Sequence, residues 1–193
     1  MPRANIKAIS LKGVNFVNGI DLSKATALAL FTLDDFKSIS ELDLSNTVIG
    51  NQEISEYDKS IANGLHLFNG EDLEKVTFGK NITGKTLLME LCNLPKLTTL
   101  DLSSFKGFLD LFLLKLPNCQ ITYPKLEYVL GNDGDYFEKA IGEDAQISFL
   151  VSKDDVFAQE STLNFINSYK NNLTDQEWLS YRKNGAFRWS RSI

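Results

Sequence analysis

The residue pattern most suggestive of chemistry is the stretch at residues 79–86, Gly-Lys-Asn-Ile-Thr-Gly-Lys-Thr. It satisfies the spacing G-x-x-x-x-G-K-[ST], in which backbone N–H groups surround phosphates at the start of a helix. In that use Gly79 and Gly84 belong to the phosphate loop, Lys85 reaches the terminal phosphates and Thr86 holds magnesium. The stretch therefore makes nucleotide binding one hypothesis for this chain.

Nucleophilic catalysis would need one of the two cysteines, Cys92 or Cys119, beside the only histidine, His66. We expect Cys92 on the apolar side of a helix and Cys119 at an inward strand position, where small buried cysteines are common. The cysteine spacing predicts neither a metal site nor a disulfide framework. We therefore expect a protein without enzymatic activity, cofactor or metal, and keep a catalytic cysteine as a third hypothesis.

A different pattern recurs along the chain. Residues 97–105, Leu-Thr-Thr-Leu-Asp-Leu-Ser-Ser-Phe, follow the spacing L-x-x-L-x-L. In a strand Leu100 and Leu102 share one face while Asp101 points to the other. The same frame begins at residues 6, 39 and 73, and more weakly at residue 116. Its fourth positions are Ile9, Leu42, Val76, Leu100 and Cys119, separated by 33, 34, 24 and 19 residues.

Over residues 6–123 these frames resemble leucine-rich repeats, with the ribonuclease-inhibitor type as the nearest style. The resemblance implies an α/β fold, a short solenoid with a parallel concave sheet and convex helices. Apolar periodicity between the strands predicts helices at residues 21–36, 51–63, 84–93 and 108–116. Small repeat proteins of this style are also common among effectors that intracellular bacteria deliver into host cells.

Beyond residue 123 the frame fades, and we divide the chain into repeats over residues 1–123 and a capping region over residues 124–193. A solenoid needs its last repeat covered from water, so a mostly helical cap packed on that repeat is expected. The predicted strands lie at residues 125–130 and 146–151, and the predicted helices at residues 136–141, 154–170 and 174–183.

The chain has 193 residues, 43% of them hydrophobic, and a formal net charge of −5. The negative charge argues against general affinity for nucleic acid. No apolar run is long enough to cross a bilayer, and the first residues lack the apolar region of a cleavable secretory signal. Two cysteines without close spacing indicate a reduced environment. We expect a cytoplasmic protein or, for an effector, one delivered into a host cell without a cleavable signal.

Repeat proteins usually bind through the outward residues of their strands. The strand frames predict a concave contact surface in which acidic and basic positions alternate, which suits a polar protein–protein interface. We expect a non-catalytic module that binds another protein, inhibiting or positioning an enzyme, and no small-molecule ligand. The predicted contact residues are Lys12, Glu41, Asp43, Lys75, Thr77, Thr99, Asp101, Gln120 and Tyr123. The first strand, without a preceding cap, is expected to be an open edge.

Overall fold

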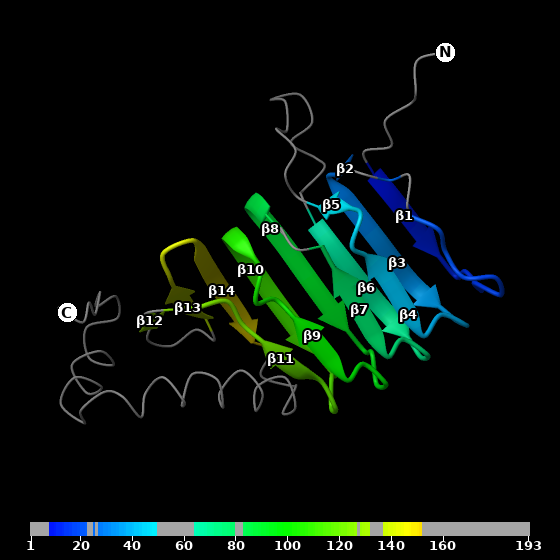
Figure 1. The fold of residues 1–193 in the computed structure, drawn as a ribbon. Helices are drawn as coiled ribbons and strands as arrows, with labels where there is room; N and C mark the ends of the chain where they lie inside the picture. Colours follow the sequence, from blue (N-terminus) through cyan, green and yellow to red (C-terminus); the bar gives the residue numbers. More distant parts are fainter. Residues whose placement is uncertain are drawn as a thin grey trace, which may run out of the picture.

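The computed structural model describes residues 8–22, 25, 27–49, 64–79, 83–126, 128–131 and 137–151. Most of these residues form two sheets that share one core (Figure 1). The eight-stranded sheet has the order β1 (Ala8–Lys12), β3 (Leu30–Phe36), β6 (Gly64–Gly70), β8 (Thr83–Cys92), β10 (Lys106–Leu114), β14 (Ala145–Val151), β13 (Phe137–Ile141) and β12 (Tyr128–Gly131). The four-stranded sheet has the order β11 (Gln120–Thr122), β9 (Thr99–Asp101), β7 (Lys75–Phe78) and β4 (Glu41–Leu44). Two short strands, β2 (Ala27–Leu28) and β5 (Val48–Ile49), pair with each other.

The chain winds through successive coils. Each coil contributes one strand to the eight-stranded sheet, then turns and contributes the next strand to the four-stranded sheet. The pairs β3–β4, β6–β7, β8–β9 and β10–β11 form these coils. Neighbouring coils stack in register and in parallel, so equivalent leucines line up across each sheet. At the C-terminal side β14 joins the large sheet parallel to β10, and β13 and β12 then add antiparallel strands.

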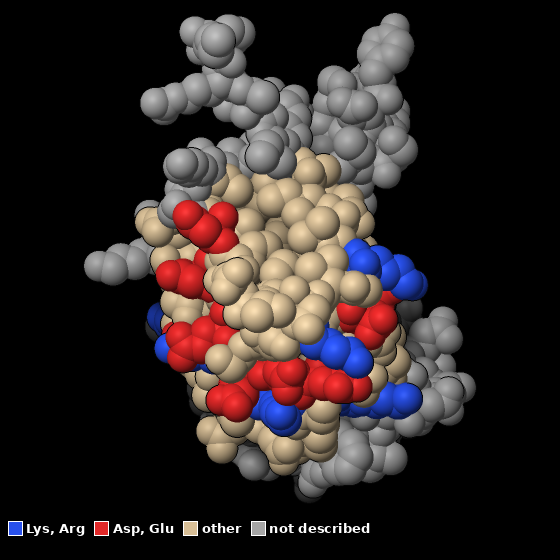
Figure 2. Space-filling model, turned by 90° about the vertical axis from the view of Figure 1, so that its right-hand side faces the viewer, with Lys and Arg blue, Asp and Glu red and all other residues tan. Residues whose placement is uncertain are grey.

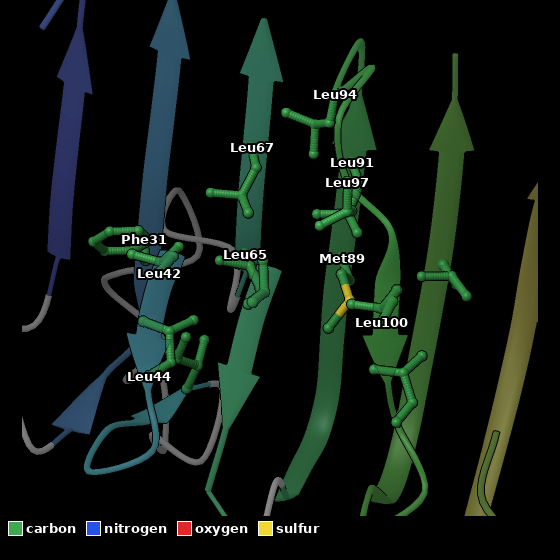
Figure 3. Packing of buried hydrophobic residues seen from close by; sticks show 14 of the residues in the cluster. Phe31, Leu42, Leu44, Leu65, Leu67, Met89, Leu91, Leu94, Leu97 and Leu100 are labelled. Carbon is green, nitrogen blue, oxygen red and sulfur yellow. The ribbon is translucent and has the colours of Figure 1, made fainter. Parts of the chain in front are cut away.

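Apolar side chains, which alternate with polar ones along the strands, fill the space between the two sheets. Figure 3 shows leucines of the small sheet, such as Leu42 and Leu100, in the same packed layer as Leu67 and Leu91 of the large sheet. All four are 1% exposed or less. Because alternate side chains of a strand share a face, each strand contributes every second residue to this layer. The two sheets therefore hold each other in place through one continuous apolar core.

The predicted α/β fold, a solenoid with convex helices and a mostly helical cap, is wrong for the described residues. Residues 30–36, 83–92, 106–114 and 137–141 form strands, and no described residue is helical, so neither convex helices nor a helical cap is present in that part of the chain. The physical reason lies in strands such as β10, which are apolar at both odd and even positions. Such a run satisfies a helical period and a strand period equally well. The predicted helices at residues 51–63, 154–170 and 174–183 lie outside the described residues.

The predicted strands starting near residues 39, 73, 97 and 146 are confirmed as β4, β7, β9 and β14. Two frame assignments are corrected. Ile9 of β1 pairs with Phe31 in the eight-stranded sheet, so the first frame does not belong beside β4. Ile121, not Cys119, is the residue in register with Leu100. The last coil is therefore offset from its predecessor by 21 residues, which is the separation of Leu100 and Ile121.

A polar ladder fixes the turn between the two sheets. The Nδ2 group of Asn93 donates to Oδ1 of Asn69 at 2.9 Å, and Nδ2 of Asn69 donates to Oδ1 of Asp34 at 2.9 Å. Lys12 extends the ladder to β1 through an ion pair with Asp34 at 2.7 Å. Each rung links neighbouring coils and holds them in register. Left-handed backbone recurs at the equivalent turn positions, with φ of 52° at Asp35, 55° at Asn69, 56° at Asn93 and 55° at Lys115.

The N-terminal end of the core is covered by the segment that follows β1. The N–H of Phe16 donates to the carbonyl of Lys37 at 3.0 Å, and the Phe16 side chain is 8% exposed. Leu22 is likewise buried. The expectation of an uncapped first strand is therefore only partly right, since β1 is an edge of the large sheet but the core beside it is closed. Figure 2, which views the β1 side, shows acidic and basic side chains interspersed around a largely uncharged area.

Candidate functional site

The outer side of the four-stranded sheet, here called the polar face, consists of two rows of polar side chains that run across the strands. Pairing of the strands places Glu41 beside Lys75, Lys75 beside Thr99, and Thr99 beside Gln120. The second row lies two residues further along each strand and consists of Asp43, Thr77, Asp101 and Thr122. All eight are exposed except Thr77, which is half-buried. The structure thus brings seven predicted contact residues together and adds Thr122, which has the outward parity of Gln120.

Two predicted contact residues lie elsewhere. Lys12 is exposed but belongs to the eight-stranded sheet, where it pairs with Asp34. Tyr123 packs against the core, with its ring edge-on to Phe149 at a centroid distance of 5.5 Å. Its orientation follows from parity, because Tyr123 is two residues beyond the inward Ile121. The prediction that these two residues line the same surface as the other seven is wrong.

The two acidic residues of the second row also hold their own turns. Oδ1 of Asp43 accepts from the N–H of Ser45 at 2.8 Å, and Oδ1 of Asp101 accepts from the N–H of Ser103 at 2.9 Å. Hydrogen bonds from the serine hydroxyl and then the serine N–H lower the pKa of both carboxyl groups below the usual value. Both groups are therefore ionised above mildly acidic pH and present fixed negative charge at the same end of the sheet.

The described residues of the stretch 79–86 do not have the geometry of a phosphate-binding loop. Gly79 directly follows β7, while Gly84, Lys85 and Thr86 lie inside the strand β8. Phosphate binding by this motif relies on N–H groups that converge at a helix N-terminus. The N–H groups of a strand do not converge in this way. Gly79 has a packing role instead, because a Cβ there would come within 2.6 Å of the Ser45 carbonyl oxygen. Residues 80–82 lie outside the described residues.

The outer side of the eight-stranded sheet, here called the mixed face, combines apolar and ionisable side chains. It consists of the outward residues of β3, β6, β8 and β10, namely Leu30, Thr32, Asp34, His66, Phe68, Leu88, Glu90, Cys92, Phe108, Asp110, Phe112 and Leu114. All of them are half-buried except Phe108, which is 51% exposed. This surface was not predicted, because the residues of β3, β8 and β10 have an apolar period that also fits a helix. The signal that could have revealed it is apolar alternation that recurs in equivalent positions of consecutive strands.

His66 and Glu90 form a hydrogen bond in the middle of the mixed face. Nδ1 of His66 lies 2.6 Å from Oε2 of Glu90 on the adjacent strand, and the two side chains are 12% and 31% exposed. The other ring nitrogen, Nε2, lies above Gly64, where an added Cβ would overlap it. The glycine therefore provides the space into which the imidazole lies.

In this orientation the His66 ring does not direct a nitrogen at Cys92, as a catalytic cysteine would require. Cys92 is paired with Phe68, two residues beyond His66, whereas Nε2 points to Gly64, two residues before it. A general base would have to direct its free nitrogen at the sulfur. Burial raises the pKa of Cys119 to about 12, which leaves that thiol protonated and inert.

Comparisons with known proteins identify no relative. A scan of protein-family models, a search of curated proteins and a search of solved structures each found no match. The likeness to leucine-rich repeats thus rests on the residue frames alone. Within the described residues, no helix has the length and apolar character needed to span a membrane. In the same part of the chain, no three His, Cys, Asp or Glu side chains gather as a metal site would require.

Proposed function

We propose that this chain is a non-catalytic protein-binding module and that its polar face contacts the partner protein. The observation that carries the proposal is the pair of registered rows of polar side chains on a sheet whose inner side is fixed in the core. Residues in such rows are pre-positioned, so little side-chain or backbone ordering is needed on binding.

The charge pattern supports recognition of a specific polar surface. Glu41 and Lys75 are adjacent in the first row, while Asp43 and Asp101 carry negative charge in the second. No large apolar side chain interrupts the eight positions. Complementary charges at such interfaces chiefly determine partner choice and association rate. The partner we expect therefore presents basic groups opposite the second row and mixed charge opposite the first.

The test removes charge from the second row without disturbing its turns. Asn keeps the oxygen that accepts from Ser45 and Ser103, so the double variant Asp43→Asn/Asp101→Asn should fold as the wild type does. Proteins captured from lysate by immobilised wild-type chain should be retained at least tenfold less by this variant. The matched control is Asp144→Asn, which removes an exposed carboxylate far along the chain. Equal capture by all three proteins would move the contact surface off the polar face.

Nucleotide binding through Lys85 and Thr86 is the alternative that the sequence raised, and no feature of the described residues favours it. A thermal-shift measurement with magnesium and nucleotides addresses it, since a ligand that binds the folded state raises the melting temperature. A shift that is lost in Lys85→Ala would establish the alternative.

A further inference from the structure

We propose that the mixed face is a second docking surface and that it fits a segment of a partner protein carrying a lysine or arginine flanked by apolar side chains. In this proposal the cation lies on Asp110, and the apolar neighbours pack on Phe108 and Phe112. The surface is separate from the polar face, because the two lie on opposite outer sides of one core.

The arrangement around Asp110 is set by strand register. Phe108 and Phe112 are the next outward residues before and after it on β10, and Leu88 of β8 is paired with it. Glu90, paired with Phe112, lies diagonally from Asp110 on the same side of the sheet. On the other side of β10, Ser148 of β14 is paired with Asp110 and Gln146 with Phe108. Asp110 is thus a carboxylate with apolar neighbours along its own strand and on β8, and with polar neighbours on β14.

The side chains around Asp110 have the composition of an interaction surface. Phe108 is 51% exposed, although Leu109, next to it on the inner side, is 1% exposed. Parallel sheets usually have both faces covered, and large exposed aromatic residues are typical anchors of protein interfaces. Covering the aromatic residues would remove apolar surface from water and stabilise a complex.

Charge identifies the kind of partner. Three carboxylates lie on the mixed face, and two of them have a basic partner, since Asp34 pairs with Lys12 and Glu90 with His66. Within the described part of the chain no basic side chain pairs with Asp110. A carboxylate covered by an apolar segment alone would lose its water without compensation, so a bound segment must supply a cation there. Flanking aromatic rings also attract cations through their faces.

The same charges disfavour other classes of macromolecule. Membrane surfaces and nucleic acids carry negative charge, and Asp110 and Glu90 would repel them. A peptide segment with an isolated cation between apolar residues satisfies both the carboxylate and the aromatic frame. We therefore commit to a protein segment as the occupant.

The experiment selects displayed random twelve-residue peptides against the full chain and measures the affinity of the selected peptides, made synthetically. We expect them to carry lysine or arginine beside apolar residues, and to bind Asp110→Asn and Phe108→Ser at least tenfold more weakly than wild type. The matched control Asp144→Asn removes one carboxylate that pairs with Lys106 outside this face, and it should bind as wild type does. The polar-face variant Asp43→Asn/Asp101→Asn should also bind normally, which separates this proposal from the preceding one.

Several results would overturn the proposal. Selected peptides without a cation, peptides that bind Asp110→Asn as tightly as wild type, or a selection that yields no binder would each exclude it. Unchanged melting temperature and circular dichroism of Asp110→Asn must accompany a loss of binding, because unfolding would reduce all binding alike. Phosphatidylcholine vesicles with and without phosphatidylserine test a membrane instead, and binding to the anionic vesicles that involves Phe108 would replace a protein segment with a lipid surface.

Discussion

The polar face and the mixed face cover the same core from opposite sides, yet they are built from strands of different kinds. The strands of the polar face have three or four residues and alternate between inward apolar and outward polar residues, most cleanly in β4 and β9. The longest strands of the mixed face have nine or ten residues and are apolar on both sides. One sheet thus separates core from solvent cleanly, whereas the other keeps apolar side chains half-buried on its outer side.

The difference shows that the side of the strand on which a residue lies determines whether its side chain packs in the core or is available for contacts. On a strand with strict alternation, the outward residues have no packing duty and can be chosen for recognition. On a strand that is apolar at every position, outward residues either contribute to stability or form a contact surface for another element. The two faces therefore differ in how substitutions should divide between stability and binding.

The largest expected effects concern the inward residues, which both sheets share. Leu111→Ala in the large sheet and Leu100→Ala in the small sheet should each lower the free energy of unfolding by about 2–5 kcal/mol, because each leaves a cavity in a fully buried layer. Phe112→Ala, on the outer side next to Leu111, should cost about 1 kcal/mol, since its side chain is only half-buried. Urea denaturation measures all three. An equal loss for Phe112→Ala and Leu111→Ala would mean that the mixed face is covered as fully as the core.

Two glycines offer a sharper contrast between the sheets. Gly64→Ala and Gly79→Ala should each destabilise the fold by about 1–3 kcal/mol through crowding. The added methyl group meets the His66 side chain at Gly64 but the Ser45 backbone carbonyl at Gly79. Removing the imidazole in Gly64→Ala/His66→Ala should therefore recover most of the loss at Gly64.

The matched cycle uses Gly79→Ala/Ser45→Ala, which leaves the carbonyl in place and should recover nothing. Thermal unfolding of the single and double variants gives both coupling energies. Similar coupling at the two glycines would contradict the assignment of one clash to a side chain and the other to the backbone.

Asp43 and Asp101 predict a smaller, pH-dependent effect on the polar face. Asp101→Ala should cost about 0.5–1.5 kcal/mol by removing the acceptor for Ser103, while Asp101→Asn should cost less. Hydrogen bonds from the serines lower the pKa of both carboxyl groups in the folded state. Their contribution is therefore present above the unfolded pKa of about 3.9 and is lost as the pH falls below it.

Both carboxylates are exposed, so solvent reduces the size of this contribution. Chemical denaturation of the wild type and Asp43→Ala/Asp101→Ala between pH 6 and pH 3 should show two curves that converge on acidification. Curves that stay parallel would show that neither carboxylate stabilises its turn in the ionised form.

The sequence was sufficient to locate β4, β7 and β9 of the small sheet, but β3, β8 and β10 of the large sheet were predicted as helices. Strict alternation at Leu42–Leu44 and Leu100–Leu102 identified β4 and β9, and with them most of the polar face. In β10 the apolar residues at both parities fit a helical and a strand period equally well, and the placement of this strand depends on pairing with β8 and β14. Contacts such as the His66–Glu90 hydrogen bond join residues 24 positions apart, so they cannot be predicted before the strand register is known.

The smallest expected change in the free energy of unfolding concerns the turns between the two sheets. Lys115 adopts φ of 55° at the position where the two preceding coils have Asn69 and Asn93. A left-handed backbone is costly for lysine but readily adopted by asparagine, so Lys115→Asn should raise the free energy of unfolding by roughly 0.5 kcal/mol. The reverse change, Asn93→Lys, should cost more than this gain because it also removes the hydrogen bond to Asn69. Urea denaturation distinguishes the two contributions. Destabilisation by Lys115→Asn would show that the last turn is held by contacts of the lysine side chain and not by the backbone conformation shared with the other coils.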